Sequence, residues 1–149
     1  MAATRTARAR WEGTLLEGRG TVSTATTDLF ADAPITWAAR TEDPDGMTSP
    51  EELLAAAHAA CYAMAFSNVL AKAGTPANSL EVEATATFGP KEGGGMMVST
   101  MELTVQGDVP GLDQAGFEQA AQEGEAGCPI SNALRGNVDI SVAATLTSS

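Results

Sequence analysis

The chain has 149 residues, a formal net charge of −11 at pH 7 and 44% hydrophobic residues, enough for a sizeable apolar core. This length favours a single domain over residues 1–149 that folds without disulfide staples. The negative charge repels phosphate backbones and anionic lipid surfaces, so we expect no nucleic-acid partner and no membrane partner. The N-terminal MAATRTARARW is basic, but no apolar segment follows it. We therefore expect no secretion signal and a cytoplasmic location.

The first 48 residues have the patterns of strands and turns. Residues 11–16 and 20–26 flank the turn-like Glu17-Gly18-Arg19, which predicts a β-hairpin. Residues 35–40 (ITWAAR) are a third predicted strand. Residues 41–48 (TEDPDGMT) are rich in turn formers and predict a loop.

A long helix follows the loop, and its two ends have clear signals. Ser49 suits the N-cap, Pro50 the first helical position, and Glu52 completes a capping box. Gly74 is placed to end the helix, with Pro76 shortly beyond.

The same helix contains the longest apolar segment of the chain, residues 53–73, which is long enough to span a bilayer. Nine of its 21 residues are alanines, however, and His58, Ser67, Asn68 and Lys72 interrupt it. A helix that is apolar on nearly every side in such a chain is predicted to be the buried central helix of the fold.

The rest of the chain alternates between strands and helices. Residues 80–88 and 97–106 each have one apolar face, and the glycine-rich residues 91–95 join them, so two strands are predicted. A second helix is predicted over residues 113–126, with a short turn beginning at Cys128-Pro129 and a final strand over residues 138–144. The order βββ, α, ββ, α, β predicts an α+β fold.

Cys61 lies in the middle of the long helix, about 15 Å from its N-terminus, so the helix dipole does little for its thiolate. Burial would raise its pKa, so a reactive Cys61 needs a cation from elsewhere in the chain. Arg40 is the best candidate because it ends an apolar strand and stays charged when buried. Glu51, on the first helical turn, is placed to hold the guanidinium through a bidentate pair.

Cys128 shows the opposite pattern, because its position at the start of a helix favours the thiolate. On the residues alone, either cysteine could be the one that attacks and the other the one that resolves. Three plainer interpretations remain open. The two thiols could be inert core residues, His58 could join both in a Cys₂His zinc site, and Arg40 with Glu51 could be an ordinary structural ion pair.

Two segments are more specific than these patterns. TSPEELLAAAHAACYAMAFSNVLAKAG and AGCPISNAL resemble the OsmC/Ohr family of thiol-dependent peroxidases, and the likeness extends over essentially the whole chain. The histidine in AAHAACY is more similar to the OsmC branch. The family pattern corresponds to Arg40, Glu51, Cys61 and Cys128, with Arg19 as a rival for the arginine.

The resemblance implies two long central helices packed between antiparallel-rich sheets, in an intertwined homodimer with active sites at its interface and with no metal or organic cofactor. It implies that Cys61 attacks organic hydroperoxides, and hydrogen peroxide more weakly, to give an alcohol and a sulfenic acid. Cys128 would then form a disulfide with Cys61, and an external dithiol such as a lipoylated protein would reduce it. The alternative is a non-catalytic redox-sensing or ligand-binding protein of the same fold.

Overall fold

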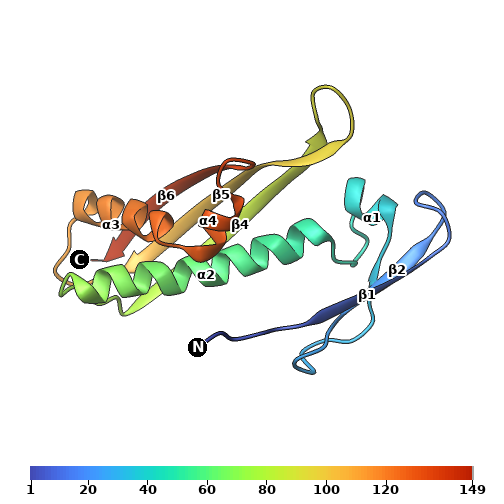
Figure 1. The fold of residues 1–149 in the computed structure, drawn as a ribbon. Helices are drawn as coiled ribbons and strands as arrows, with labels where there is room; N and C mark the ends of the chain where they lie inside the picture. The colour runs from blue at the N-terminus through green and yellow to red at the C-terminus, as the bar shows by residue number, and fades with distance from the viewer. Residues whose placement is uncertain (149) are drawn as a thin grey trace. The chain divides into compact units, whose positions relative to one another are not determined.

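In the computed structural model of the chain, which describes residues 1–148, the strands form two three-stranded sheets (Figure 1). The first sheet is antiparallel and has the order β1 (Ala7–Glu12), β2 (Arg19–Thr24), β3 (Ala33–Ile35). In the second sheet β4 and β5 are antiparallel and β6 runs parallel to β5. Its strands are β4 (Ser79–Pro90), β5 (Met96–Asp108) and β6 (Asp139–Ser148).

Four helices complete the described part of the chain: α1 (Trp37–Thr41), α2 (Pro50–Lys72), α3 (Gln114–Ala126) and α4 (Pro129–Leu134). The predicted α+β class is therefore confirmed. The chain forms two compact units, one of Met1–Leu53 and one from Leu54 onward. The first sheet and α1 belong to the first unit, and the second sheet, most of α2, α3 and α4 belong to the second.

The N-terminal hairpin exists, but its predicted boundaries are wrong. β1 begins at Ala7, in the basic N-terminal segment, and Glu12 pairs with Arg19, so the turn occupies residues 13–18. Gly13 explains this register, because its φ of +89° is a left-handed conformation that ends a strand. Residues 13–16, which we predicted to be part of a strand, belong to the turn.

The third predicted strand, residues 35–40, is also wrong beyond Ile35. Residues from Trp37 onward form α1, because the Thr36 side chain caps the helix by accepting a hydrogen bond from the Ala39 N–H at 3.0 Å. Two consecutive alanines, the best helix formers, follow Trp37 and favour the helical turn. Arg40 therefore lies in the last turn of a short helix rather than at the end of a strand.

The ends of α2 are close to those predicted. Ser49 Oγ accepts a hydrogen bond from the Glu52 N–H at 3.1 Å. The second half of the expected capping box is replaced, because the Glu52 carboxylate accepts a hydrogen bond from the Thr48 hydroxyl at 2.7 Å. At the other end Gly74 has a φ of +83°, and the Thr75 N–H bonds to the Leu70 carbonyl at 3.0 Å, as in a Schellman motif.

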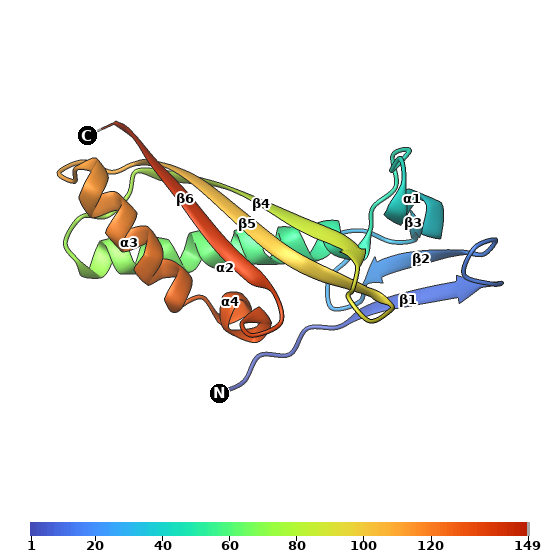
Figure 2. The same ribbon diagram turned by 90° about the horizontal axis from the view of Figure 1, so that it is seen from above.

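Within residues 1–148, α2 alone has the length and apolar composition of a membrane-spanning helix. It is nevertheless a core helix, because His58, Tyr62, Phe66 and Leu70 recur every four residues and are fully buried. This face joins buried residues of β5 and α3 in one apolar cluster. Figures 1 and 2 show α2 running lengthwise along the sheet of β4, β5 and β6.

Burial of α2 is confined to that one face, which is less than the sequence predicts. Ala56, Ala57 and Ala60 are exposed, and Met64 has 69% of its surface accessible. The helix therefore presents an apolar, alanine-rich face on its other side.

The remaining elements agree with the sequence. β4 and β5 alternate as predicted around the glycine-rich turn, and the buried face of β5 includes Met101, Leu103 and Val105. Asp113 caps α3 by accepting a hydrogen bond from the Gly116 N–H at 2.8 Å, and Gly127 ends the helix. Cys128 occupies the N-cap of α4, with Pro129 at the first helical position.

Candidate active site

Cys61 and Cys128 lie together in the second unit, although they come from different helices. Cys61 is partly buried in the middle of α2, and Cys128 is fully buried at the start of α4. The Cys128 thiol is within hydrogen-bond reach of the Cys61 sulfur, and both cysteines are free thiols. The fold thus places two reduced cysteines where one can react with an oxidised form of the other.

The surroundings of Cys61 favour its protonated form. Burial raises the pKa of the Cys61 thiol, and Cys128 raises it further, while a hydrogen bond from the Ile130 N–H lowers it. The upward direction is the one expected for a thiol in an apolar helix. The two residues that act on Cys61 both lie at the start of α4, and neither carries a cation.

The Ile130 N–H is a functional group that the sequence analysis missed. We expected the start of α4 to stabilise the thiolate of Cys128, but one of its backbone N–H groups, that of Ile130, donates to Cys61 instead. A signal was present in the sequence, because the first N–H groups of any helix lack partners within that helix. What the sequence does not contain is the direction in which those groups point.

His58 is fully buried on α2, and its Nε2 lies 2.7 Å from Ser131 Oγ on α4. Burial lowers the pKa of His58, and the Glu125 carboxylate opposes this shift. The imidazole thus bonds a serine of α4. Within residues 1–148 there is no group of three His, Cys, Asp or Glu side chains arranged to hold a metal ion, so the Cys₂His alternative has no geometric support.

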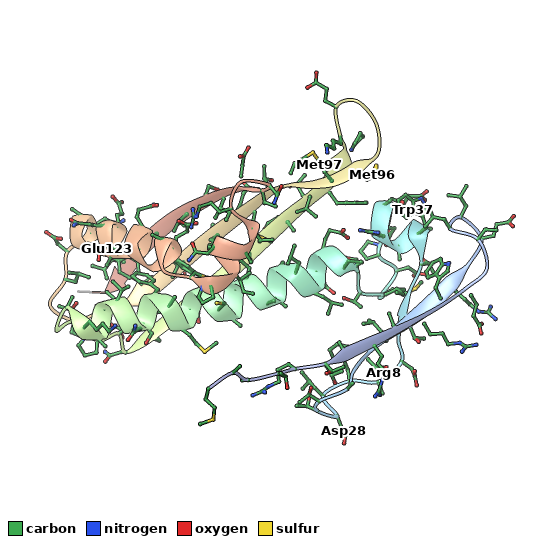
Figure 3. The ribbon with its side chains drawn as sticks, in the orientation of Figure 1. Arg8, Asp28, Trp37, Met96, Met97 and Glu123 are labelled. Atoms are coloured by element: carbon green, nitrogen blue, oxygen red, sulfur yellow. The ribbon has the colours of Figure 1, made fainter. Side chains whose placement is uncertain are left out.

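Arg40 and Glu51 form an ion pair inside the first unit, with the geometry that we expected. Arg40 Nη2 lies 2.7 Å from Glu51 Oε1, and Arg40 Nε lies 3.1 Å from each carboxylate oxygen. The Glu51 side chain is 9% exposed and that of Arg40 is 30% exposed. The guanidinium carbon lies 5.7 Å from the centroid of the Trp37 ring, on the α1 side chain labelled in Figure 3. Carboxylate and ring together fix the position of the cation.

An apolar pocket of about 230 Å³ lies beside this guanidinium in the first unit. Its walls include Trp11, Leu15, Ile35 and Trp37, and Arg40 supplies one polar edge. A pocket of this kind suits a small apolar group that carries a polar atom at one end.

Arg19, the rival arginine, has different surroundings. It is exposed at the first position of β2 and borders a separate hollow of about 480 Å³ with Arg10 and Glu12. Glu12 is paired with Arg10 at 2.6 Å, and no ion pair to Arg19 is seen in residues 1–148. Arg19 therefore lacks the carboxylate partner that holds Arg40. The structure groups the four predicted site residues into two pairs, Cys61 with Cys128 and Arg40 with Glu51.

Comparison with known proteins identifies the family. The OsmC-like protein family matches residues 43–143. The chain is 36% identical over 133 residues to peroxiredoxin OsmC of Escherichia coli, which covers 89% of the chain and 91% of the relative.

Two solved structures share the fold. An organic hydroperoxide resistance protein, OhrB of Bacillus subtilis, has a TM-score of 0.70 and 26% identity, with 94% of the chain and 98% of OhrB covered. An organic hydroperoxide resistance protein OsmC from Legionella pneumophila has a TM-score of 0.71 and 25% identity, with 97% of the chain and 99% of the Legionella protein covered. The chain belongs to the OsmC-like protein family and to its OsmC branch.

Proposed function

We propose that this protein reduces organic hydroperoxides to alcohols through Cys61, and hydrogen peroxide more weakly. The observation that carries the proposal is the contact between the Cys61 sulfur and the Cys128 thiol on two helices of one unit. The protein is an enzyme of the thiol-dependent peroxidase class, in line with the name of its peroxiredoxin relative.

The reaction follows from the chemistry of the two thiols. The Cys61 thiolate attacks the distal oxygen of the hydroperoxide, the O–O bond breaks, and the alcohol leaves, so that Cys61 becomes a sulfenic acid. The Cys128 sulfur then attacks the Cys61 sulfur, a disulfide forms, and water leaves. An external dithiol, such as a lipoylated protein, returns both cysteines to thiols by exchange.

Attack requires a thiolate, and the local surroundings of Cys61 oppose it. Arg40 is the proposed cation, and Glu51 is the group that orients it. Lowering a thiol pKa from about 8.5 by about two units makes most of the thiol ionised at pH 7, and a close cation can supply that shift. The buried carboxylate of Glu51 supports this role, because it holds the guanidinium in one orientation.

The apolar pocket beside Arg40 supports an organic substrate. Its two tryptophans suit the hydrocarbon part of a hydroperoxide, and the guanidinium suits the oxygen end. Hydrogen peroxide has no apolar part to place there, so it would be the weaker substrate.

The remaining expectations concern assembly and location. We propose a homodimer in which a second copy covers the exposed face of α2, where Met64 and a groove of about 600 Å³ leave apolar surface uncovered. We also propose that the two units act as one domain, that no metal or organic cofactor takes part, and that the enzyme is cytoplasmic.

Consumption of cumene hydroperoxide with dihydrolipoamide as reductant tests the function directly. We expect multiple turnovers, with hydrogen peroxide consumed more slowly at equal concentration. Formation of the Cys61–Cys128 disulfide without turnover would indicate a redox sensor instead. Failure of Cys61 to react with either peroxide would contradict both functions.

A further inference from the structure

The hydrogen bond between His58 and Ser131 joins α2 to α4 inside the core. Both side chains are fully buried, and Nε2 and Oγ are 2.7 Å apart, although the residues are 73 positions apart in the chain. A buried hydrogen bond is strong because the surrounding dielectric constant is low, and an unpaired partner would be costly to leave there. The proposed reaction assigns neither residue a role.

The two residues flank the thiols at a regular spacing. His58 lies three residues before Cys61, so the two side chains are about one turn apart on the same side of α2. Ser131 lies three residues after Cys128 and directly after Ile130, in the first turn of α4. The hydrogen bond thus connects the segment that carries one cysteine to the segment that carries the other.

α4 needs such a connection because it has little stability of its own. It has six residues, and its N-cap residue, Cys128, makes no side-chain capping bond. Helices this short do not persist without tertiary contacts. The orientation of the Ile130 N–H and the position of the Cys128 thiol therefore depend on what holds α4 in place.

We propose that His58 and Ser131 are a positioning pair that holds the first turn of α4 on α2, so that the Ile130 N–H and the Cys128 thiol both face the Cys61 sulfur. The pair has two consequences. It stabilises the Cys61 thiolate through the Ile130 N–H. It also keeps Cys128 ready to attack the Cys61 sulfenic acid before a second peroxide oxidises it to sulfinic acid. The second consequence rests on the proposed peroxidase function, whereas the first does not.

A catalytic serine is excluded by the same geometry. Glu125 acts electrostatically on His58, so the residue types match those of a Ser-His-Glu hydrolase site. Ser131 has no exposed surface, however, and a substrate carbonyl cannot reach its hydroxyl. The Glu125 carboxylate itself is paired with Arg135, whose Nη2 lies 2.9 Å from Oε1. The arrangement thus serves to hold α4.

The first test measures the Cys61 thiolate in a Cys128→Ser background, where Cys61 is the only thiol. Thiolate absorbance and the rate of iodoacetamide alkylation are followed against pH, without any peroxide. We expect Ser131→Ala and His58→Leu to raise the midpoint of the Cys61 titration by about one pH unit, which slows alkylation at pH 7 about tenfold. His58→Gln, which keeps a polar nitrogen near the position of Nε2, should retain most of the wild-type value. Ser141→Ala, an exposed serine on β6, is the matched control.

The double variant His58→Leu with Ser131→Ala shows whether the two residues act as one unit. If they do, the Cys61 titration midpoint of the double variant is no higher than that of either single variant, because the same hydrogen bond is lost in each case. Additive shifts would overturn the pair. If His58→Leu does not fold, as judged by circular dichroism, the comparison of Ser131→Ala with Ser141→Ala decides the first test.

The second test measures the resolving step with both cysteines present. After one equivalent of cumene hydroperoxide, dimedone traps the sulfenic acid and mass spectrometry gives the fractions of disulfide and sulfinic acid. We expect Ser131→Ala to form the disulfide at least about tenfold more slowly and to accumulate sulfinic acid, with His58→Gln close to wild type. Excess oxidised glutathione provides a parallel measure of disulfide formation without peroxide, because Cys61 attacks its disulfide and Cys128 then displaces the bound glutathione.

The outcomes separate this inference from the proposed function. If wild-type Cys61 does not react with hydroperoxide, the function fails, while the titration and the measurement with oxidised glutathione still decide the pair. If Ser131→Ala titrates and forms the disulfide like wild type, the positioning role is wrong. If His58→Gln shifts the Cys61 titration as much as His58→Leu does, and thermal stability falls in parallel, the pair is only structural.

Discussion

The two pairs of site residues have opposite electrostatic surroundings. In the first unit Arg40 lies against a carboxylate and an aromatic ring, so a cation is held in place there without any thiol. In the second unit Cys61 lies among apolar side chains with a second thiol, and its surroundings raise its pKa. One region thus supplies a fixed charge, and the other supplies sulfur in its unreactive form.

In our proposal, the peroxidase reaction needs both regions. A dry, apolar surround protects a sulfenic acid but disfavours the thiolate that forms it. The Ile130 N–H partly offsets that cost, because hydrogen bonds to a charged sulfur are stronger than those to a neutral one. In our proposal a cation supplies the rest, and the ion pair with Glu51 keeps Arg40 oriented for that role.

The largest effect is expected from the cysteines themselves. Cys61→Ser should abolish turnover, because it removes the attacking sulfur. Cys128→Ser should still consume about one hydroperoxide per site and then stall or form sulfinic acid, because only recycling needs the second thiol. Stoichiometry of peroxide loss, followed by mass spectrometry, measures both variants. A first turnover that survives in Cys61→Ser and is lost in Cys128→Ser would reverse the assignment.

The next largest effect is expected from Arg40, the proposed cation in the first unit. Arg40→Met keeps length and apolar bulk but removes the cation, so the Cys61 pKa should return to or above that of a free thiol, about 8.5. The thiolate fraction at pH 7 falls to a few per cent, which costs at least about tenfold in rate, or about 1.4 kcal/mol. The measurement is the rate of thiolate alkylation against pH.

Arg19→Met is the control for this prediction, because Arg19 is exposed and has no carboxylate partner in the described chain. Its titration should match wild type. Glu51→Gln should shift the Cys61 titration in the same direction as Arg40→Met but less, because it only releases the guanidinium. An unmoved curve in Arg40→Met with a shifted one in Arg19→Met would transfer the role to Arg19.

A third prediction concerns the packing of α3 against α2, in the unit that contains the two cysteines. Gly124 lets α3 approach α2 closely, since a Cβ there would lie 3.0 Å from both Cα and Cβ of Phe66. Gly124→Ala should therefore lower the free energy of unfolding by about 1 kcal/mol, through overpacking. Gly127→Ala is the matched control, because its Cβ would lie 3.6 Å from its nearest neighbour, an ordinary contact. Denaturant titrations of both variants make the comparison, and equal losses would contradict it.

The smallest effect concerns pH and the one histidine of the chain. Burial lowers the pKa of His58, so the unfolded chain takes up a proton near pH 6.5 that the folded protein does not bind. The contribution of neutral His58 to the free energy of unfolding is therefore fully present above about pH 6.5, and it is lost as the pH falls toward the pKa of His58 in the folded protein. Denaturant titrations from pH 7 downward should show this fall in wild type. They should show a smaller one in His58→Gln, which cannot take up the proton.

Local signals in the sequence determined much of the fold. Ser49 and Gly74 bound α2 because capping depends on residues within one turn. The alternation in β4 and β5 predicted which face is buried, because successive side chains of a strand point to opposite faces. The expected Arg40–Glu51 pair is present. The two cysteines stood out because each has a distinctive local context, one in an alanine-rich helix and one before a proline.

The tertiary structure decided what local signals leave open. The helix at Arg40 is not one of these cases, because the Thr36 cap that starts it is a local signal, which we misread as part of a strand. Nothing in the sequence pairs β6 in parallel with β5, aims the Ile130 N–H at Cys61, or brings Ser131 to His58. Each of these is a contact between residues distant along the chain. Such contacts depend on how helices and strands pack, because packing fixes the directions of side chains and free amides, and residue type and spacing do not.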